Sequence, residues 1–124
     1  QKQEQQPMRT IRSSLYRVSA GTGVLLDDDA WEEIQVPDTE EAQKADFALR
    51  IAGDSMEPIY HDGDIVLVEK TDILQVGEIG IFFVNGNGYI KKFGGDRLIS
   101  LNDAYADIAL TNQARCFGKV IGRV

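Results

Sequence analysis

Residues 52–68 read Ala-Gly-Asp-Ser-Met-Glu-Pro-Ile-Tyr-His-Asp-Gly-Asp-Ile-Val-Leu-Val. The last four residues form a β-branched run after the turn signal His-Asp-Gly-Asp, and this pattern predicts a strand. Residues 47–51 alternate between apolar and polar or small side chains, which is the period of another strand. Ser55 therefore falls in a turn between two predicted strands, where its hydroxyl can face a reacting group.

The rest of the chain repeats this pattern of short apolar runs separated by turn signals. Asn85-Gly86-Asn87-Gly88 tolerates positive φ angles and predicts a hairpin. One short segment, residues 39–44, is compatible with a helix. Many short strands at this spacing predict a mainly β domain. The further predicted strands are 79–84, 89–93, 98–101 and 116–124.

Two parts of the chain differ in composition. Residues 1–14 are polar and Gln-rich, so we expect a flexible linker or tail, and residues 15–124 are expected to form one domain. No run of about 18 apolar residues and no signal peptide occurs, so we expect neither a membrane span nor export. The single cysteine, Cys116, is compatible with a reducing cytoplasm. Gln1 in place of a starting methionine suggests a fragment of a longer protein.

The charge balance argues against direct DNA binding by this chain. The formal net charge is −7, with 13 basic residues dispersed among 20 acidic ones. A DNA-binding surface needs clustered Lys and Arg to neutralise phosphates. No set of side chains has the spacing of metal ligands, and no cofactor motif occurs, so we expect neither a metal nor a cofactor.

A serine nucleophile needs a base, and the sequence offers two kinds. His61 is the only histidine, but its place in a turn favours an ordinary solvated side chain. Lys91 shares a strand face with Tyr89 and Phe93, where burial would lower the pKa of its amine and leave it able to take a proton. Lys92 points the other way and is expected to be a solvated surface charge. Ordinary solvated residues remain an alternative for both lysines.

The motif Ala-Gly-Asp-Ser-Met-Glu-Pro, followed by Asp-Gly-Asp and a lysine on a later strand, resembles the Ser-Lys peptidase domain of LexA, phage repressors and UmuD-type proteins. The resemblance covers roughly residues 15–124 and implies a LexA/signal-peptidase-like β domain. It makes Ser55 the nucleophile, Lys91 the base, and the backbone N–H groups of Asp54 and Ser55 the oxyanion donors. Asp54 is a departure, because LexA-like proteins often carry other residues there. A type I signal peptidase would show a membrane anchor and an Arg-x-Ile-Gly-x-Pro-Gly-Asp box, and neither is present.

The same resemblance implies a cleavage site within the chain. LexA-like proteins cut themselves at a small-residue–Gly bond before the domain core, and Ala20-Gly21 matches this bond. Arg17, Val18 and Ser19 would be the substrate segment that enters the cleft. Glycine after the cut lets the backbone approach the nucleophile closely.

The resemblance also implies partners. We expect a homodimer, with the final strand at residues 116–124 in the contact, and a helix-turn-helix domain before Gln1 through which alone the protein would bind DNA. A RecA filament or an antirepressor would induce it, as part of an SOS-type response in the cytoplasm. Two alternatives stay open, a dimerisation module that does not cleave itself and a UmuD-like polymerase accessory protein.

Overall fold

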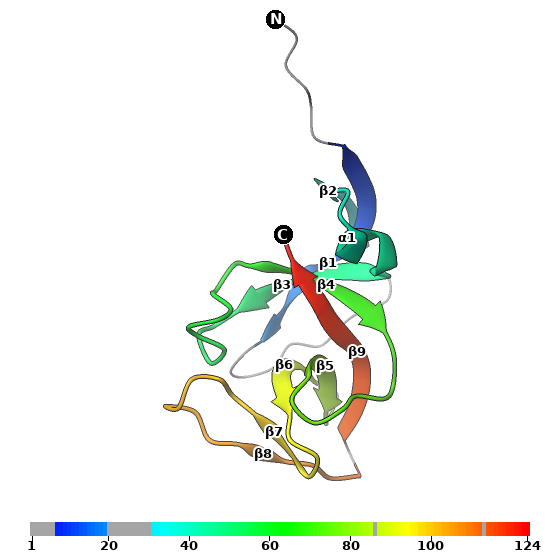
Figure 1. Cartoon of the computed structure of the whole chain (residues 1–124). Coiled ribbons are helices and arrows are strands. Elements are labelled where there is room, and N and C mark those ends of the chain that lie inside the picture. Colours follow the sequence, from blue (N-terminus) through cyan, green and yellow to red (C-terminus); the bar gives the residue numbers. More distant parts are fainter. Residues whose placement is uncertain (1–6, 20–30, 86, 113) are drawn as a thin grey trace, which may run out of the picture.

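A computed structural model of the chain describes residues 7–19, 31–85, 87–112 and 114–124. Within this part, nine strands form a single sheet in the order β2-β1-β3-β4-β9-β5-β6-β7-β8, and one short helix packs beside it (Figure 1). The elements are β1 (Met8–Ser19), β2 (Trp31–Pro37), α1 (Glu40–Lys44), β3 (Phe47–Ala52), β4 (Ile65–Lys70), β5 (Ile79–Val84), β6 (Asn87–Phe93), β7 (Arg97–Ile99), β8 (Ile108–Ala109) and β9 (Ala114–Arg123).

Strand β1 belongs to two parts of the sheet. Its first half pairs antiparallel with β2, and its second half pairs in parallel with β3. At its end, Ser19 also pairs with Tyr89 of β6, and this contact links the sheet back onto itself. The pairings β1–β3–β4–β9–β5–β6–β1 therefore form a closed circuit, and residues 17–19 occupy the position between β3 and β6.

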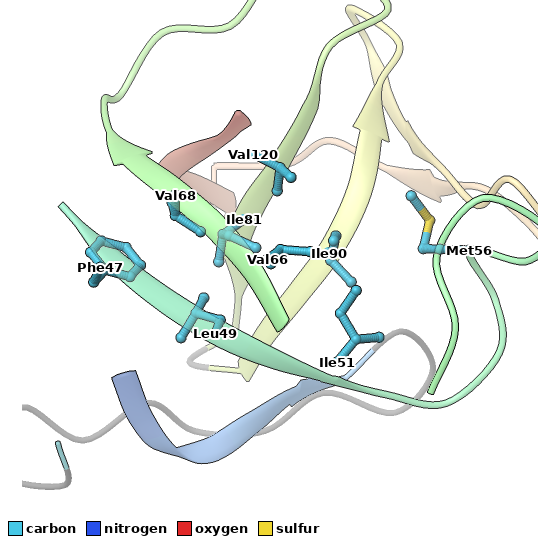
Figure 2. Packing of buried hydrophobic residues seen from close by; sticks show 9 residues of the cluster. All are labelled: Phe47, Leu49, Ile51, Met56, Val66, Val68, Ile81, Ile90 and Val120. Carbon is cyan, nitrogen blue, oxygen red and sulfur yellow. The ribbon is translucent and has the colours of Figure 1, made fainter. Parts of the chain in front are cut away.

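The main apolar core lies inside this circuit (Figure 2). Its buried members come from five elements and from the loop after β3, so that strands distant in sequence share one interior. Removal of such side chains from water is the main favourable term in folding. The buried members are Phe47, Leu49, Ile51, Met56, Val66, Val68, Ile81, Ile90 and Val120.

A second, smaller cluster lies where α1 packs against the sheet. The helix buries Ala42 among side chains of β1, β2, β3 and β4. Thr39 caps its start by accepting a hydrogen bond from the Ala42 N–H at 3.1 Å, which satisfies one of the unpaired donors of the first turn. The buried residues of the cluster are Ile11, Val36, Ala42, Ala48 and Leu67.

The predicted fold class is confirmed, since the structure is mainly β with one five-residue helix inside the segment expected to be helical. The linker prediction for residues 1–14 is wrong in part, because β1 begins at Met8. Residues 8–14 pair with β2 along their whole length, and Ile11 is buried. Pairing and burial of alternate side chains stabilise this strand despite its polar composition.

Candidate active site

The loop after β3 holds Ser55 in a fixed position. Gly53 begins the loop with φ 94°, a left-handed conformation that favours glycine, and its N–H donates to the Asp62 carboxylate at 2.8 Å. Met56 then enters the main core and is fully buried. The hydrogen bond at Gly53 and the burial of Met56 anchor the loop on either side of Ser55, whose side chain is fully buried as well.

The Ser55 hydroxyl lies beside an amine and a second hydroxyl. Lys91 Nζ of β6 is 2.9 Å from Ser55 Oγ and 2.8 Å from Ser100 Oγ. Lys91 is 2% exposed and Ser100 6% exposed, so all three polar groups are shielded from water. The sequence thus places together, from positions 36 residues apart, a nucleophile of the right type and a candidate base.

Burial changes the acid–base behaviour of Lys91. Removal from water disfavours the charged ammonium, and this lowers the pKa of Lys91 from 10.5 to about 8. At pH 7 roughly one-tenth of such amines are neutral, against about one in 3,000 for an ordinary lysine. A neutral amine has a lone pair that can accept the proton of a hydroxyl at hydrogen-bond distance.

The segment after β7 is bound to the nucleophile loop at several points. The Asn102 backbone N–H donates to the Ser55 carbonyl at 2.8 Å, and its side-chain amide donates to the Asp54 carbonyl at 3.1 Å. The Tyr105 hydroxyl donates to the Asp54 carboxylate, which raises the pKa of Tyr105. The Tyr105 ring lies with its centroid 6.0 Å from Lys91 Nζ. Residues 100–105 therefore cover one side of the Ser55–Lys91 pair.

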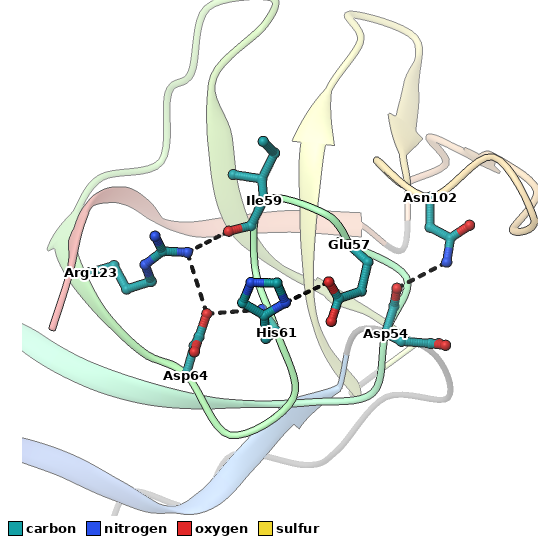
Figure 3. A network of polar contacts seen from close by, with 7 residues as sticks. All are labelled: Asp54, Glu57, Ile59, His61, Asp64, Asn102 and Arg123. Carbon is teal, nitrogen blue, oxygen red and sulfur yellow. Dashed lines mark hydrogen bonds and ion pairs between the residues drawn. The ribbon is translucent and has the colours of Figure 1, made fainter.

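The alternative base, His61, belongs to a separate network at the surface (Figure 3). Its Nδ1 lies 2.5 Å from Glu57 Oε2, and its backbone N–H donates to Asp64, which also contacts Arg123. The His61 side chain is 56% exposed. This agrees with the solvated turn residue that the sequence favoured, and the amine in contact with Ser55 is that of Lys91.

The expectation about the two faces of β6 holds for Lys91, which is buried, and is wrong for the opposite face. Ile90, which shares a face with Lys92, is fully buried in the main core, and Lys92 is partly buried. One face of β6 covers the core and the other covers Ser55, so neither is a solvent face. The aromatic ring found near the amine belongs to Tyr105 instead of the two aromatics of β6.

The predicted substrate segment is described only up to Ser19. The backbone of residues 17–19 pairs in parallel with residues 50–52, immediately before the nucleophile loop. Ala20 and Gly21 lie outside the described residues. The oxyanion role of the Asp54 and Ser55 N–H groups stays a prediction.

Sequence reasoning missed Ser100, although a signal for it exists. The β6–β7 register pairs Lys92 with Ile99, and one further step in each strand sets Lys91 opposite Ser100. Directly opposed residues of antiparallel strands share a face. The hairpin between residues 93 and 97 therefore predicts this neighbour.

The described residues include no helix with the length and apolarity needed to span a membrane. They also include no group of three His, Cys, Asp or Glu side chains placed to hold a metal ion.

The fold and site define a class of protein, a mainly β domain with a buried serine–lysine pair at the end of a strand. The family model described as Peptidase S24-like matches residues 13–123. The chain belongs to this family.

The curated relatives that match the chain include several LexA repressors. The LexA repressor of Carboxydothermus hydrogenoformans is 36% identical over 115 residues, which cover 87% of this chain and 56% of that protein. The LexA repressor of Leptospira biflexa is 35% identical over 112 residues, covering 87% and 55%. That of Mycolicibacterium smegmatis is 29% identical over 120 residues, covering 93% and 49%. The chain thus spans about half the length of these relatives and is a LexA-like S24 domain.

Proposed function

We propose that this chain is the self-cleaving domain of a LexA-like repressor, with Ser55 as nucleophile and Lys91 as general base. The observation that carries the proposal is the 2.9 Å contact between Lys91 Nζ and Ser55 Oγ in an interior that lowers the pKa of the lysine. Membership of a peptidase family supports it, and the likeness to LexA repressors supports the repressor role.

The reaction is a peptide cleavage within one chain. Neutral Lys91 takes the Ser55 proton as Oγ attacks the carbonyl carbon of Ala20, and the N–H groups of Asp54 and Ser55 would receive the negative charge that develops on oxygen. The Lys91 ammonium then gives its proton to the Gly21 nitrogen, which leaves as the new N-terminus. Water then attacks the acyl ester while Lys91 takes one of its protons. As the ester bond breaks, Lys91 returns this proton to Ser55 Oγ, and the freed Ala20 carboxyl group ionises in water.

The position of β1 supports docking of the substrate segment next to the nucleophile. Residues 17–19 pair with β3 directly before the nucleophile loop, and Ser19 pairs with Tyr89, two residues before Lys91 on β6. An added strand uses main-chain hydrogen bonds for binding. Because substrate and nucleophile share one chain, docking supplies a high effective concentration.

The dimer and the upstream DNA-binding domain remain part of the proposal. In the described residues β9 pairs with β4 on one side and β5 on the other, so a second copy would contact its side chains or the chain end. Ile59 and Val124 are about half exposed, and Arg123 donates to the Ile59 carbonyl beside that end. We propose this end for the dimer contact.

Cleavage at Ala20 would separate the two DNA-binding domains from the dimerising part of the protein. Binding to two half-sites would then be weaker, because the two DNA contacts would no longer be linked. A RecA filament would act by favouring docking, whereas an antirepressor would inactivate the repressor without cleavage.

Incubation at alkaline pH tests the cleavage. Purified chain at pH 9–10 should yield a fragment that begins at Gly21, identified by mass spectrometry, with a rate independent of protein concentration. The Ser55→Ala variant should remain intact under the same conditions. A folded wild-type chain that stays intact would instead favour the dimerisation module without cleavage, and sedimentation analysis of Val124→Asp would then test the dimer contact alone.

A further inference from the structure

Ser100 has no assigned part in the chemistry, yet it contacts the base directly. Its Oγ lies 2.8 Å from Lys91 Nζ, slightly closer than Ser55 Oγ at 2.9 Å. Its side chain is 6% exposed, and it comes from the residue directly after β7. We propose that Ser100 is a positioning residue, which holds the Lys91 amine with its lone pair directed at the Ser55 hydroxyl. This inference rests on the proposed function.

The hydrogen-bond capacity of a neutral amine explains the need for such a group. A neutral amine has two N–H donors and one lone pair, arranged tetrahedrally about nitrogen. If Ser100 Oγ accepts one N–H, rotation about the Cε–Nζ bond is confined to those staggered positions that keep this bond. The lone pair can then meet the Ser55 O–H. Without the Ser100 contact, more orientations of the amine turn an N–H toward Ser55 Oγ, and an N–H cannot accept a proton.

The backbone holds Ser100 where this role requires it. The tight turn between β6 and β7 is closed by the Gly94 N–H donating to the Arg97 carbonyl at 2.8 Å, and the strand register sets Ser100 opposite Lys91. Two residues later, the Asn102 N–H donates to the Ser55 carbonyl. Ser100 is thus tied to the strand of the base and, through Asn102, to the loop of the nucleophile. Its distance to both groups is set by one short rigid segment.

A positioning role for Ser100 predicts a different experimental result from a role in setting the pKa of Lys91. A hydroxyl that accepts from the amine also stabilises the ammonium, so its loss does not raise the pKa of Lys91. Ser100→Ala should therefore leave the midpoint of the pH–rate profile of self-cleavage unshifted or move it downward. The rate on the alkaline plateau, where the amine is neutral throughout, should fall roughly 10-fold to 100-fold because the lone pair is misdirected.

Two variants separate positioning from simple loss of stability. Ser100→Thr keeps the hydroxyl and should restore most of the plateau rate. Thr39→Ala removes a hydroxyl that caps α1, away from the site, and should lower the free energy of unfolding while leaving the plateau rate unchanged. A Ser100→Ala plateau equal to that of the wild type would overturn the proposal, as would an effect on the midpoint alone.

A second measurement works even if the chain does not cut itself. In Ser55→Ala protein, nuclear magnetic resonance should resolve two separate signals for the Hε protons of Lys91, because Ser100 fixes the end of the side chain. In the Ser55→Ala/Ser100→Ala protein these signals should merge. Merged signals in both proteins would refute the positioning role. Separate signals that depend on Ser100, in a wild-type chain that never cleaves, would sustain the positioning role and overturn the proposed self-cleavage.

Discussion

Two polar clusters include side chains of the loop at residues 53–64, and they differ in their access to water. The inner cluster of Ser55, Lys91 and Ser100 is almost fully buried, whereas the outer pair of His61 and Glu57 is 56% and 32% exposed. Shielding lowers the pKa of the inner amine, and exposure leaves the outer pair surrounded by water. Contact with Ser55 Oγ and burial together support the proposed assignment of Lys91, instead of His61, as the base.

Removal of each candidate base in turn should give the largest effect on the rate of self-cleavage. Lys91→Ala removes the only amine in contact with Ser55 among the described residues and should slow self-cleavage at pH 9 by about 10³-fold or more. His61→Ala should change the rate less than about twofold, since the exposed imidazole has its contact with Glu57. Gel densitometry over time measures both. A large loss of rate in His61→Ala with little change in Lys91→Ala would make His61 the base.

The pH dependence should follow the inner cluster. Because the proposed base is the neutral amine of Lys91, the cleavage rate should rise about tenfold per pH unit below pH 8 and level off above about pH 9. The His61→Ala variant should give the same profile. A rise that ends near pH 7 in the wild type and disappears in His61→Ala would contradict the comparison.

Burial of Lys91 should also appear in the pH dependence of stability. The folded pKa of about 8 lies below the ordinary 10.5, so the unfolded chain binds more protons between these values, and stability rises with pH there. Relative to Lys91→Met, the free energy of unfolding of the wild type should gain about 3 kcal/mol from pH 8 to 10.5. Denaturant titrations at several pH values measure this difference. A parallel pH dependence in both proteins would mean that the amine is solvated.

The outer pair should give the smallest effect. Glu57→Gln weakens an exposed contact with His61, and such pairs contribute about 0.2–1 kcal/mol. We expect the free energy of unfolding to fall by an amount in this range at pH 6, and by less in 1 M salt. The rate of self-cleavage at pH 9 should not change. A loss above 2 kcal/mol, measured by urea denaturation, would show that this pair stabilises the fold more than an exposed ion pair does.

The sequence predicted most of the fold and two of the three polar groups of the buried site, Ser55 and Lys91 but not Ser100. Alternating and β-branched runs predicted the strands, and the Ser55 motif with a lysine on a hairpin strand predicted the pair. The start of β1 at Met8 was missed because its polar residues gain their structure from pairing with β2, a tertiary contact that local pattern does not encode. Burial of the β6 face that carries Ile90 and Lys92 was missed for a similar reason, since its cover is the main core, which strands distant in sequence build together. Ser100 could have been found only by extending the β6–β7 register.

The state of the Lys91 amine is the central claim, and nuclear magnetic resonance titration of its ε-carbon tests it most directly. Spectra of intact chain with labelled lysine, assigned by comparison with Lys91→Met, should show Lys91 losing its proton near pH 8, well below the 10.5 of an ordinary lysine in water. A Lys91 midpoint near 10.5 would contradict the account, because the amine would then be charged at every pH where the repressor is expected to act.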